Sequence, residues 1–175
     1  MRLRKATAAA HQALDTQVTH SQLADLTDYR HFLEASAAAL IPLEAALEDS
    51  DVSAIVDDWC ERTRANAIRI DLARVGGHVH PLPPVKRLGR AEMLGALYVL
   101  EGSRLGAKYL LRTAKASSDP VVAGATAYLG HGGDKPLWPT FLAVLERESP
   151  SVDEADAIAG AAMAFDLFST AFARP

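Results

Sequence analysis

The sequence predicts an all-α protein, because apolar residues recur at helical spacing and no segment alternates in the manner of a β-strand. Alanine and leucine are abundant, and β-branched residues seldom occur in runs. Between residues 26 and 47 the apolar side chains recur at steps of three and four, which places them on one face of a helix. The chain has 175 residues and 49% of them are hydrophobic. These values fit one folded domain over residues 1–175.

Helix-breaking and capping residues divide this domain into successive helices. The expected helices cover about residues 2–15, 25–49, 52–75, 90–116, 120–129, 138–148 and 152–172. Pro42 predicts a kink or a break inside the second helix, and Gly76–Gly77 ends the third. Three prolines make residues 78–89 a loop. Ser151, with Glu154 three residues later, predicts a capping box for the last helix. The third helix is expected to bury Ile55, Val56, Trp59 and Ile70.

Composition excludes several classes of protein. The net charge of −4 gives no strong attraction to nucleic acid. The single cysteine, Cys60, excludes a disulfide framework and any multi-cysteine metal site. The N-terminus is basic, but no apolar stretch of signal-peptide type follows it. No window approaches 18 uninterrupted apolar residues, so no transmembrane helix is expected and the cytoplasm is the expected location.

The helix expected over residues 90–116 contains three glycines, which each cost about 1 kcal/mol relative to alanine in a helix interior. Gly102 and Gly106 lie about 40° apart around the helix, with the small Ser103 between them in sequence. A face without side chains lets another surface approach the backbone. Three interpretations stay open: tight helix–helix packing, a hinge, or a flat ligand lying against bare backbone.

His11 differs from the other five histidines because it lies on an amphipathic helix. Seven residues of helix turn through about 700°, so Arg4 and His11 share a face about 10 Å apart along the axis. A haem needs a nitrogen ligand for iron and cations for its propionates, and this pair offers both. A structural role for a lone histidine remains the alternative. The remaining histidines lie in loops, turns or helix boundaries and have no evident function, namely His20, His31, His78, His80 and His131.

Several segments of the chain resemble the haem oxygenase family. Residues 3–15, LRKATAAAHQALD, resemble its proximal helix, and residues 95–110, GALYVLEGSRLGAKYL, resemble its distal helix. The segments YRHFLEASAAALIPLEAAL, LWPTFLAVLE and GAAMAFDLFSTAF are also similar in order and spacing, so the resemblance covers nearly the whole chain. The segment YVLEGSRLG most resembles the bacterial branch, including members encoded with bacteriophytochromes.

The resemblance implies a haem oxygenase-like fold with haem between the first helix and the glycine-containing distal helix. His11 would be the iron ligand, and Gly102 and Gly106 would let the distal helix steer oxygen onto a meso carbon of the ring. Arg4 matches a basic residue that meets a propionate, and Thr7 belongs to the same cofactor-binding motif. Haem, both substrate and cofactor, would yield biliverdin, carbon monoxide and ferrous iron. The implied partners are an electron donor such as a ferredoxin with its reductase, and a bacteriophytochrome as biliverdin acceptor.

Ser103 completes the expected catalytic set with Gly102 and Gly106, and it departs from animal-type relatives. Those relatives have an aspartate at this position, which anchors ordered water. A serine orders water without adding a charge, so the route of the protons is left open. Tyr98 and Lys108 are candidates for the cavity rim. Phe165 and Phe168 could line the haem, although core packing is the simpler interpretation.

Three other functions compete with haem cleavage. A non-catalytic haem- or bilin-binding protein would retain the same histidine and glycines. A di-iron carboxylate bundle would need Glu-x-x-His pairs, and none of the six histidines has a glutamate three residues before it. A thiaminase-like protein would need a nucleophilic cysteine, and Cys60 has no histidine nearby in sequence.

Overall fold

The structure is a computed structural model that describes residues 2–19 and 23–174. Within those ranges every regular element is a helix, which confirms the all-α prediction. The α-helices in chain order are α1 (Leu3–Ala6), α2 (Ala8–Thr19), α3 (Leu26–Asp49), α4 (Trp59–Arg62), α5 (Ala65–Val75), α6 (Arg90–Lys115), α7 (Pro120–Gly124), α8 (Ala127–Gly130), α9 (Leu137–Glu148) and α10 (Glu154–Phe172). Two 3₁₀ turns, η1 (Val52–Ala54) and η2 (Ser149–Ser151), join helices.

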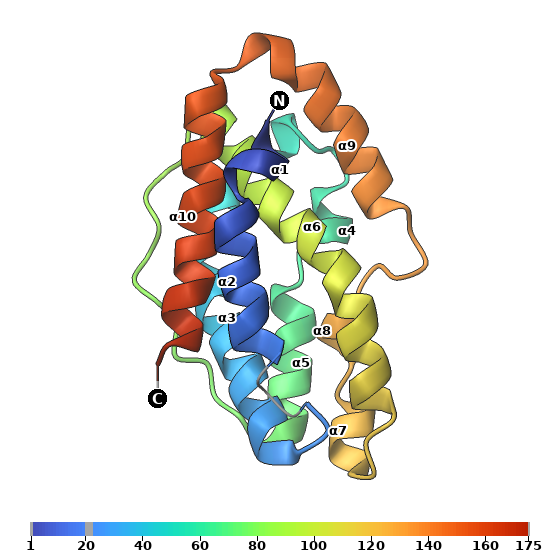
Figure 1. The fold of residues 1–175 in the computed structure, drawn as a ribbon. Helices are drawn as coiled ribbons and strands as arrows, with labels where there is room; N and C mark the ends of the chain where they lie inside the picture. Colours follow the sequence, from blue (N-terminus) through green and yellow to red (C-terminus); the bar gives the residue numbers. More distant parts are fainter. Residues whose placement is uncertain (1, 20–22, 175) are drawn as a thin grey trace.

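The N-terminal half of α6 packs closely against α10 (Figure 1). A Cβ atom on Gly95 would lie 1.9 Å from the carbonyl oxygen of Ala157, and one on Gly160 would lie 2.1 Å from that of Glu92. Such separations are too short for any side chain, so these two glycines permit the contact of the two helices. The packing interpretation therefore holds for Gly95.

The long helix α3 continues through Pro42 without the expected break. Proline has no N–H group and leaves the carbonyl oxygen four residues earlier without its helical partner. In this chain the N–H of Leu82, in the proline-rich loop, donates to that oxygen on Ala38 over 2.8 Å. The loop thus replaces the missing hydrogen bond, and Asp25 caps the start of α3 by accepting from the N–H groups of Thr27 and Asp28.

Four predicted elements differ from the structure. The helix expected over residues 2–15 is divided into α1 and α2, and α2 extends to Thr19. The helix expected over residues 52–75 is divided into η1, α4 and α5, and Ile70, expected to be buried, is 50% exposed. The helix expected over residues 120–129 is divided into α7 and α8. The cap of the last helix is Asp153, which accepts from the N–H groups of Ala155 and Asp156, and Ser151 lies in η2 instead. The Gly76 end of α5 is confirmed, with the left-handed φ of 65°.

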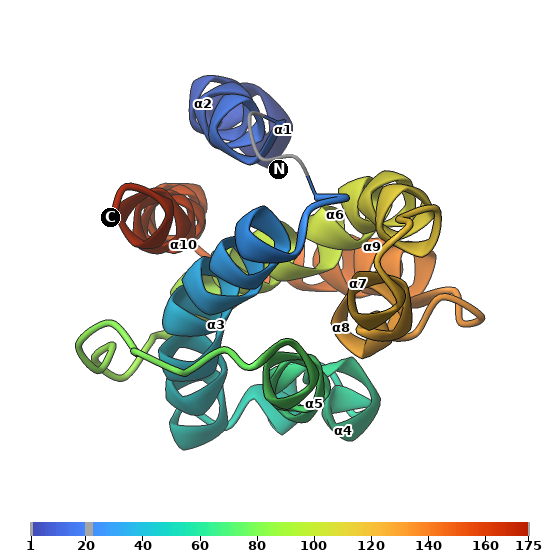
Figure 2. The ribbon, with the colours of Figure 1, turned by 90° about the horizontal axis from the view of Figure 1, so that it is seen from below.

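The first two helices lie at the edge of the molecule. Viewed along the bundle, α2 stands beside α10 and apart from α5 (Figure 2). A single residue, Thr7, interrupts α1 and α2, and its hydroxyl donates to the carbonyl oxygen of Leu3 over 2.9 Å. The nearby helix α10 is apolar and long enough to cross a membrane by length and composition alone. Its residues Ala157, Ala161 and Ala164 are fully buried in the helical core.

Candidate active site

His11 presents an accessible imidazole on α2. Its side chain is 62% exposed, and its Nδ1 lies 2.9 Å from a carboxylate oxygen of Asp15, one turn later. The ring of Phe165, on α10, meets the imidazole edge-on at a centroid distance of 6.0 Å. With Nδ1 engaged by the carboxylate, Nε2 is the ring nitrogen left for a metal.

Arg4 on α1 and Thr7 between α1 and α2 differ in exposure. Arg4 is exposed on α1, and its charge acts on Tyr98 of α6. Burial raises the pKa of the Tyr98 phenol, and the Arg4 guanidinium opposes that shift. Thr7 is only 4% exposed and its hydroxyl is bonded to Leu3, so little of its surface is left for a ligand. Contact between Thr7 and a cofactor therefore remains a prediction, and the burial of the Thr7 side chain does not favour it.

The glycines of α6 lie on one face but have different neighbours. Gly95, Gly102 and Gly106 fall within about 40° of one another around the helix. Gly95 is closed by α10, whereas a Cβ on Gly106 would meet no atom within 4 Å. Leu105 and Tyr109, which flank Gly106, are 52% and 66% exposed. The glycine face is therefore packed at its start and open, with apolar flanks, at its end.

Trp138, at the start of α9, borders this face at Gly102. A Cβ on Gly102 would lie 3.6 Å from the indole ring, and the ring of Tyr98 lies 5.7 Å from it between centroids. The sequence pattern predicted Trp138 only as the start of a helix. Its place in the LWPTFLAVLE segment, which resembles the family, was the one signal that could have drawn attention to it.

Ser103 is bonded to a cation that the sequence pattern did not identify. The Nη1 of Arg64 donates to the Ser103 hydroxyl oxygen over 3.1 Å, and that hydroxyl donates to the Leu100 carbonyl oxygen over 2.7 Å. The Nη2 of Arg64 donates to the same carbonyl over 3.0 Å. Arg64 is 2% exposed and precedes α5, 39 residues from Ser103 in sequence. A sequence separation of this size gives no local signal.

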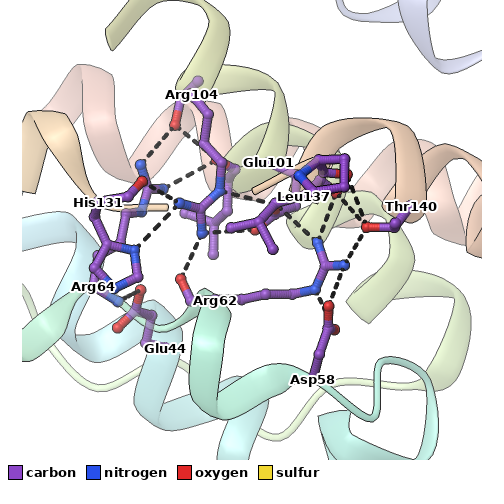
Figure 3. Close-up of polar contacts among 12 residues, drawn as sticks. Glu44, Asp58, Arg62, Arg64, Glu101, Arg104, His131, Leu137 and Thr140 are labelled. Carbon is purple, nitrogen blue, oxygen red and sulfur yellow. Dashed lines mark hydrogen bonds and ion pairs between the residues drawn. The ribbon is translucent and has the colours of Figure 1, made fainter. Parts of the chain in front are cut away.

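A buried ion network underlies this part of α6 (Figure 3). The carboxylate of Glu101, 1% exposed, accepts from Arg62 and from both Nε and Nη2 of Arg104. Arg62 also donates to the carboxylate of Asp58 and to the hydroxyl of Thr140. Buried charges are stable only when paired and hydrogen-bonded, so this network fixes α4, α6 and α9 relative to one another.

Two buried carboxylates hold the elements beneath Arg64. Glu44 on α3 accepts from the N–H groups of Arg64 and Ala65 at the start of α5, over 2.8 and 2.9 Å. Asp71 on α5 accepts from the N–H groups at the start of α8, including that of Tyr128 over 2.7 Å. Burial raises the pKa of Asp71, and these N–H groups oppose the shift. The Tyr128 ring then lies under the guanidinium of Arg64, 5.3 Å from ring centroid to Cζ.

The remaining candidate residues lie away from His11 or outside the described chain. His78 and His80 are exposed neighbours in the loop, and His20 lies outside the described residues. Lys108 lines a cavity behind α6 and is separate from the glycine face. Within residues 2–19 and 23–174, no group of three or more His, Cys, Asp or Glu side chains could hold a metal ion. A site of the di-iron carboxylate type is therefore absent from the described part of the chain.

Comparison with known proteins assigns this arrangement to a family. The model of the family described as Heme oxygenase matches residues 1–174. A heme oxygenase of Xanthomonas campestris pv. campestris is 34% identical over 151 residues, covering 85% of this chain and 91% of the relative. The heme oxygenase PigA of Pseudomonas aeruginosa is 31% identical, covering 95% of this chain and 87% of the relative.

A solved structure shares the fold. The NO- and CO-bound heme oxygenase of Neisseria meningitidis superposes with a TM-score of 0.73 at 22% identity, covering 98% of this chain and 88% of that one. The expected fold class is thereby confirmed. The family match spans nearly the whole sequence and includes both helices that carry the candidate residues. This chain is a member of the haem oxygenase family.

Proposed function

We propose that this haem oxygenase binds its substrate haem between α2 and α6 and converts it to biliverdin, carbon monoxide and ferrous iron, with His11 as the iron ligand. The observation that carries the proposal is the pairing of the exposed His11 Nδ1 with Asp15 at 2.9 Å. A metal-bound histidine commonly donates its other N–H to a carboxylate, which fixes the ring orientation and makes the ligand nitrogen more basic. The ring of Phe165 packs against the imidazole in a T-shaped arrangement.

The open end of the glycine face is the surface that we assign to the opposite side of haem. Gly106 offers bare backbone, because a Cβ atom at this position would meet no atom within 4 Å. Leu105 and Tyr109 expose apolar surface beside it. A flat apolar ring system would cover these side chains and gain the free energy of their burial. Arg4, whose charge reaches Tyr98 on α6, is placed to neutralise a propionate.

Ser103 and Arg64 are assigned to the delivery of protons and the ordering of water. Bound haem supplies the iron that activates dioxygen and the ring that is oxidised. The Ser103 hydroxyl donates to Leu100 and accepts from Arg64, which leaves an oxygen lone pair to accept from a water molecule. Arg64 cannot itself lose a proton, so its part is to hold Ser103 and to add a positive charge where Ser103 alone has none.

Finer features of the function are part of the same proposal. The reaction consumes reducing equivalents, for which we propose an external donor such as a ferredoxin with its reductase. The YVLEGSRLG segment supports membership of the bacterial branch that includes bacteriophytochrome-associated enzymes, with such a photoreceptor as acceptor of biliverdin. A cytoplasmic location and a single domain over residues 1–175 complete this assignment. The alternative function is a haem- or bilin-binding protein without catalysis.

Spectroscopy of His11→Ala tests the iron ligand. The wild-type haem complex is expected to give the absorption and electron paramagnetic resonance of iron with an axial imidazole. His11→Ala should lose that signature while its circular dichroism stays helical, and added imidazole should restore it. His31→Ala is the matched control, because His31 lies on α3. An unchanged spectrum in His11→Ala would place the ligand elsewhere, with His20 the first candidate.

A further inference from the structure

A cavity lies behind α6, centred on the side away from the glycine face. Its volume is about 490 Å³, within the range of small-molecule sites. Lys108 on this side is about 200° around the helix from Gly106. The cavity is completed by α8, by the loop of residues 130–136 and by Trp138 at the start of α9.

The charge of the cavity lining is entirely positive. Four cationic side chains line it, namely Arg64, Arg104, Lys108 and Lys135, and its lining includes no aspartate or glutamate among the described residues. The whole chain carries a net charge of −4, so this concentration of cations is local. The rest of the lining is mainly apolar and aromatic: Leu105, Leu111, Tyr128, Leu129, Leu137 and Trp138.

Arg64 is the buried cation of this cavity whose charge is least compensated by protein groups. Arg104 is paired with Glu101 and Lys135 with Glu61. The two Nη atoms of Arg64 instead reach neutral groups, the Ser103 hydroxyl and the Leu100 carbonyl. Its Nε, buried in a side chain that is 2% exposed, has no hydrogen-bond partner among the described residues. Buried charges in proteins are normally paired, so this guanidinium has both the charge and a donor for an anion.

The titration of two neighbours agrees with an excess of positive charge. Burial and the cations Arg104 and Arg64 lower the pKa of His131, whose ring lines the cavity. Burial and the cation Arg64 also lower the pKa of Arg104, although Glu101 opposes that shift. Burial is the larger cause of both shifts, and the contribution of the cations is the part that a bound anion would offset.

We propose that this cavity binds a small organic carboxylate with a flat apolar body. The carboxylate would lie near Arg64 and Lys108, and the apolar body would lie against Trp138 and the surrounding leucines. The Ser103 hydroxyl shares Arg64 with this cavity, so an occupant and the Ser103 hydroxyl would compete for one guanidinium. Leu105 and Trp138 border both the glycine face and this cavity, so naphthoate binding is measured on the haem-free chain.

Titration of the haem-free full-length chain with 1-naphthoate tests the proposal in a low-chloride buffer. Calorimetry should detect naphthoate binding, and the uncharged 1-naphthamide should bind about tenfold more weakly because it lacks the charge-assisted hydrogen bonds. Nuclear magnetic resonance should show the pKa of the His131 ring rising when naphthoate binds, since the anion offsets Arg104 and Arg64. The failure of haem cleavage in a separate assay would leave these results unaffected.

Variants on the cavity and outside it complete the experiment. Arg64→Met should weaken naphthoate about tenfold, and Lys108→Ala, at an exposed position, about twofold to threefold. Lys115→Ala, at the end of the same helix and outside the cavity lining, should bind like the wild type. If Arg64→Met does not fold, the naphthoate affinity of Lys108→Ala still tests whether the ligand binds in this cavity. Equal binding of the acid and the amide, ligand shifts confined to His11, or no binding at millimolar concentration would overturn the proposal.

Discussion

The Nδ1 atom of His11 lies 2.9 Å from the carboxylate of Asp15, one helical turn further along α2. Both side chains are largely exposed in this structure, at 62% and 65%, so the pair by itself adds little to stability. Its value lies in orientation, because it leaves Nε2 of His11 available for the proposed bond to iron. Covering the pair with haem would also remove water and strengthen the interaction.

Asp15→Ala is therefore expected to weaken haem binding without unfolding the protein. Loss of such a carboxylate typically costs about 10–100-fold in metal affinity, and we expect the lower end for this exposed pair. A haemin titration followed at the Soret band measures the change. Asp49→Ala, which removes an exposed carboxylate at the far end of α3, is the matched control. Equal affinity in Asp15→Ala and the wild type would show that Asp15 does not act on the ligand.

Substitutions at Gly106 and Gly95 should have opposite consequences. Gly106→Ala meets open space and should stabilise the fold by about 0.8–1 kcal/mol through helix propensity. Gly95→Ala would place its Cβ 1.9 Å from the carbonyl oxygen of Ala157 and should destabilise it by about 1–3 kcal/mol or more. Urea unfolding of the two variants checks both signs.

Gly106→Leu separates ligand blocking from helix packing at the same position. The leucine should occupy the surface assigned to haem and lower haemin affinity about tenfold or more, while the urea midpoint stays near that of Gly106→Ala. The haemin titration and urea unfolding of this one variant measure the two effects. If Gly106→Leu loses stability and keeps its haemin affinity, the face at Gly106 packs against protein instead.

The glycines illustrate how far the sequence could predict the site. The pattern predicted α6 and its bare face, and the resemblance proposed His11 as iron ligand, because each signal is local. The pattern could not assign Gly95 to packing and Gly106 to an open surface, since the difference arises from where α10 ends its contact with α6. Tertiary contact, rather than propensity, decides which glycine is covered.

The prediction of one helix over residues 52–75 is wrong for the same physical reason. Its apolar spacing fits one helix, yet Glu44 on α3 binds the N–H groups of Arg64 and Ala65 and so starts α5 at that point. The partner is 20 residues away, and Arg64 in turn reaches α6. Long-range charge pairing of this kind has no periodic signature in sequence. By contrast, the start of α3 at Asp25 and the end of α5 at Gly76 follow from local capping.

Ser103→Ala should slow haem cleavage more than it weakens haem binding. The substitution removes the acceptor of Arg64 Nη1, and leaving a buried donor without a partner costs about 1–3 kcal/mol. Single-turnover decay of the Soret band measures the rate, and a haemin titration measures the affinity. Ser103→Thr retains the hydroxyl and should recover most of the rate. A normal rate in Ser103→Ala would remove Ser103 from the proton route.

Acidification should destabilise the chain through His131. Burial, with Arg104 and Arg64, lowers the pKa of this ring in the folded state. The unfolded chain therefore binds the proton first, and the free energy of unfolding falls as pH drops below about 6.5, the ordinary value for histidine. Urea unfolding at pH 7.5 and pH 5.5 should show a smaller loss for His131→Gln than for the wild type. An identical loss of unfolding free energy in the two proteins would contradict a lowered pKa of His131.

Product analysis after haem turnover tests the central claim most directly. The full-length chain is incubated aerobically with haemin and ascorbate, and the products are followed by absorption and identified by chromatography and mass spectrometry. Loss of the Soret band together with biliverdin in proportion to the haem consumed is the predicted result. A Soret band that persists with no biliverdin formed would contradict it and would identify the chain as a haem-binding protein without catalysis.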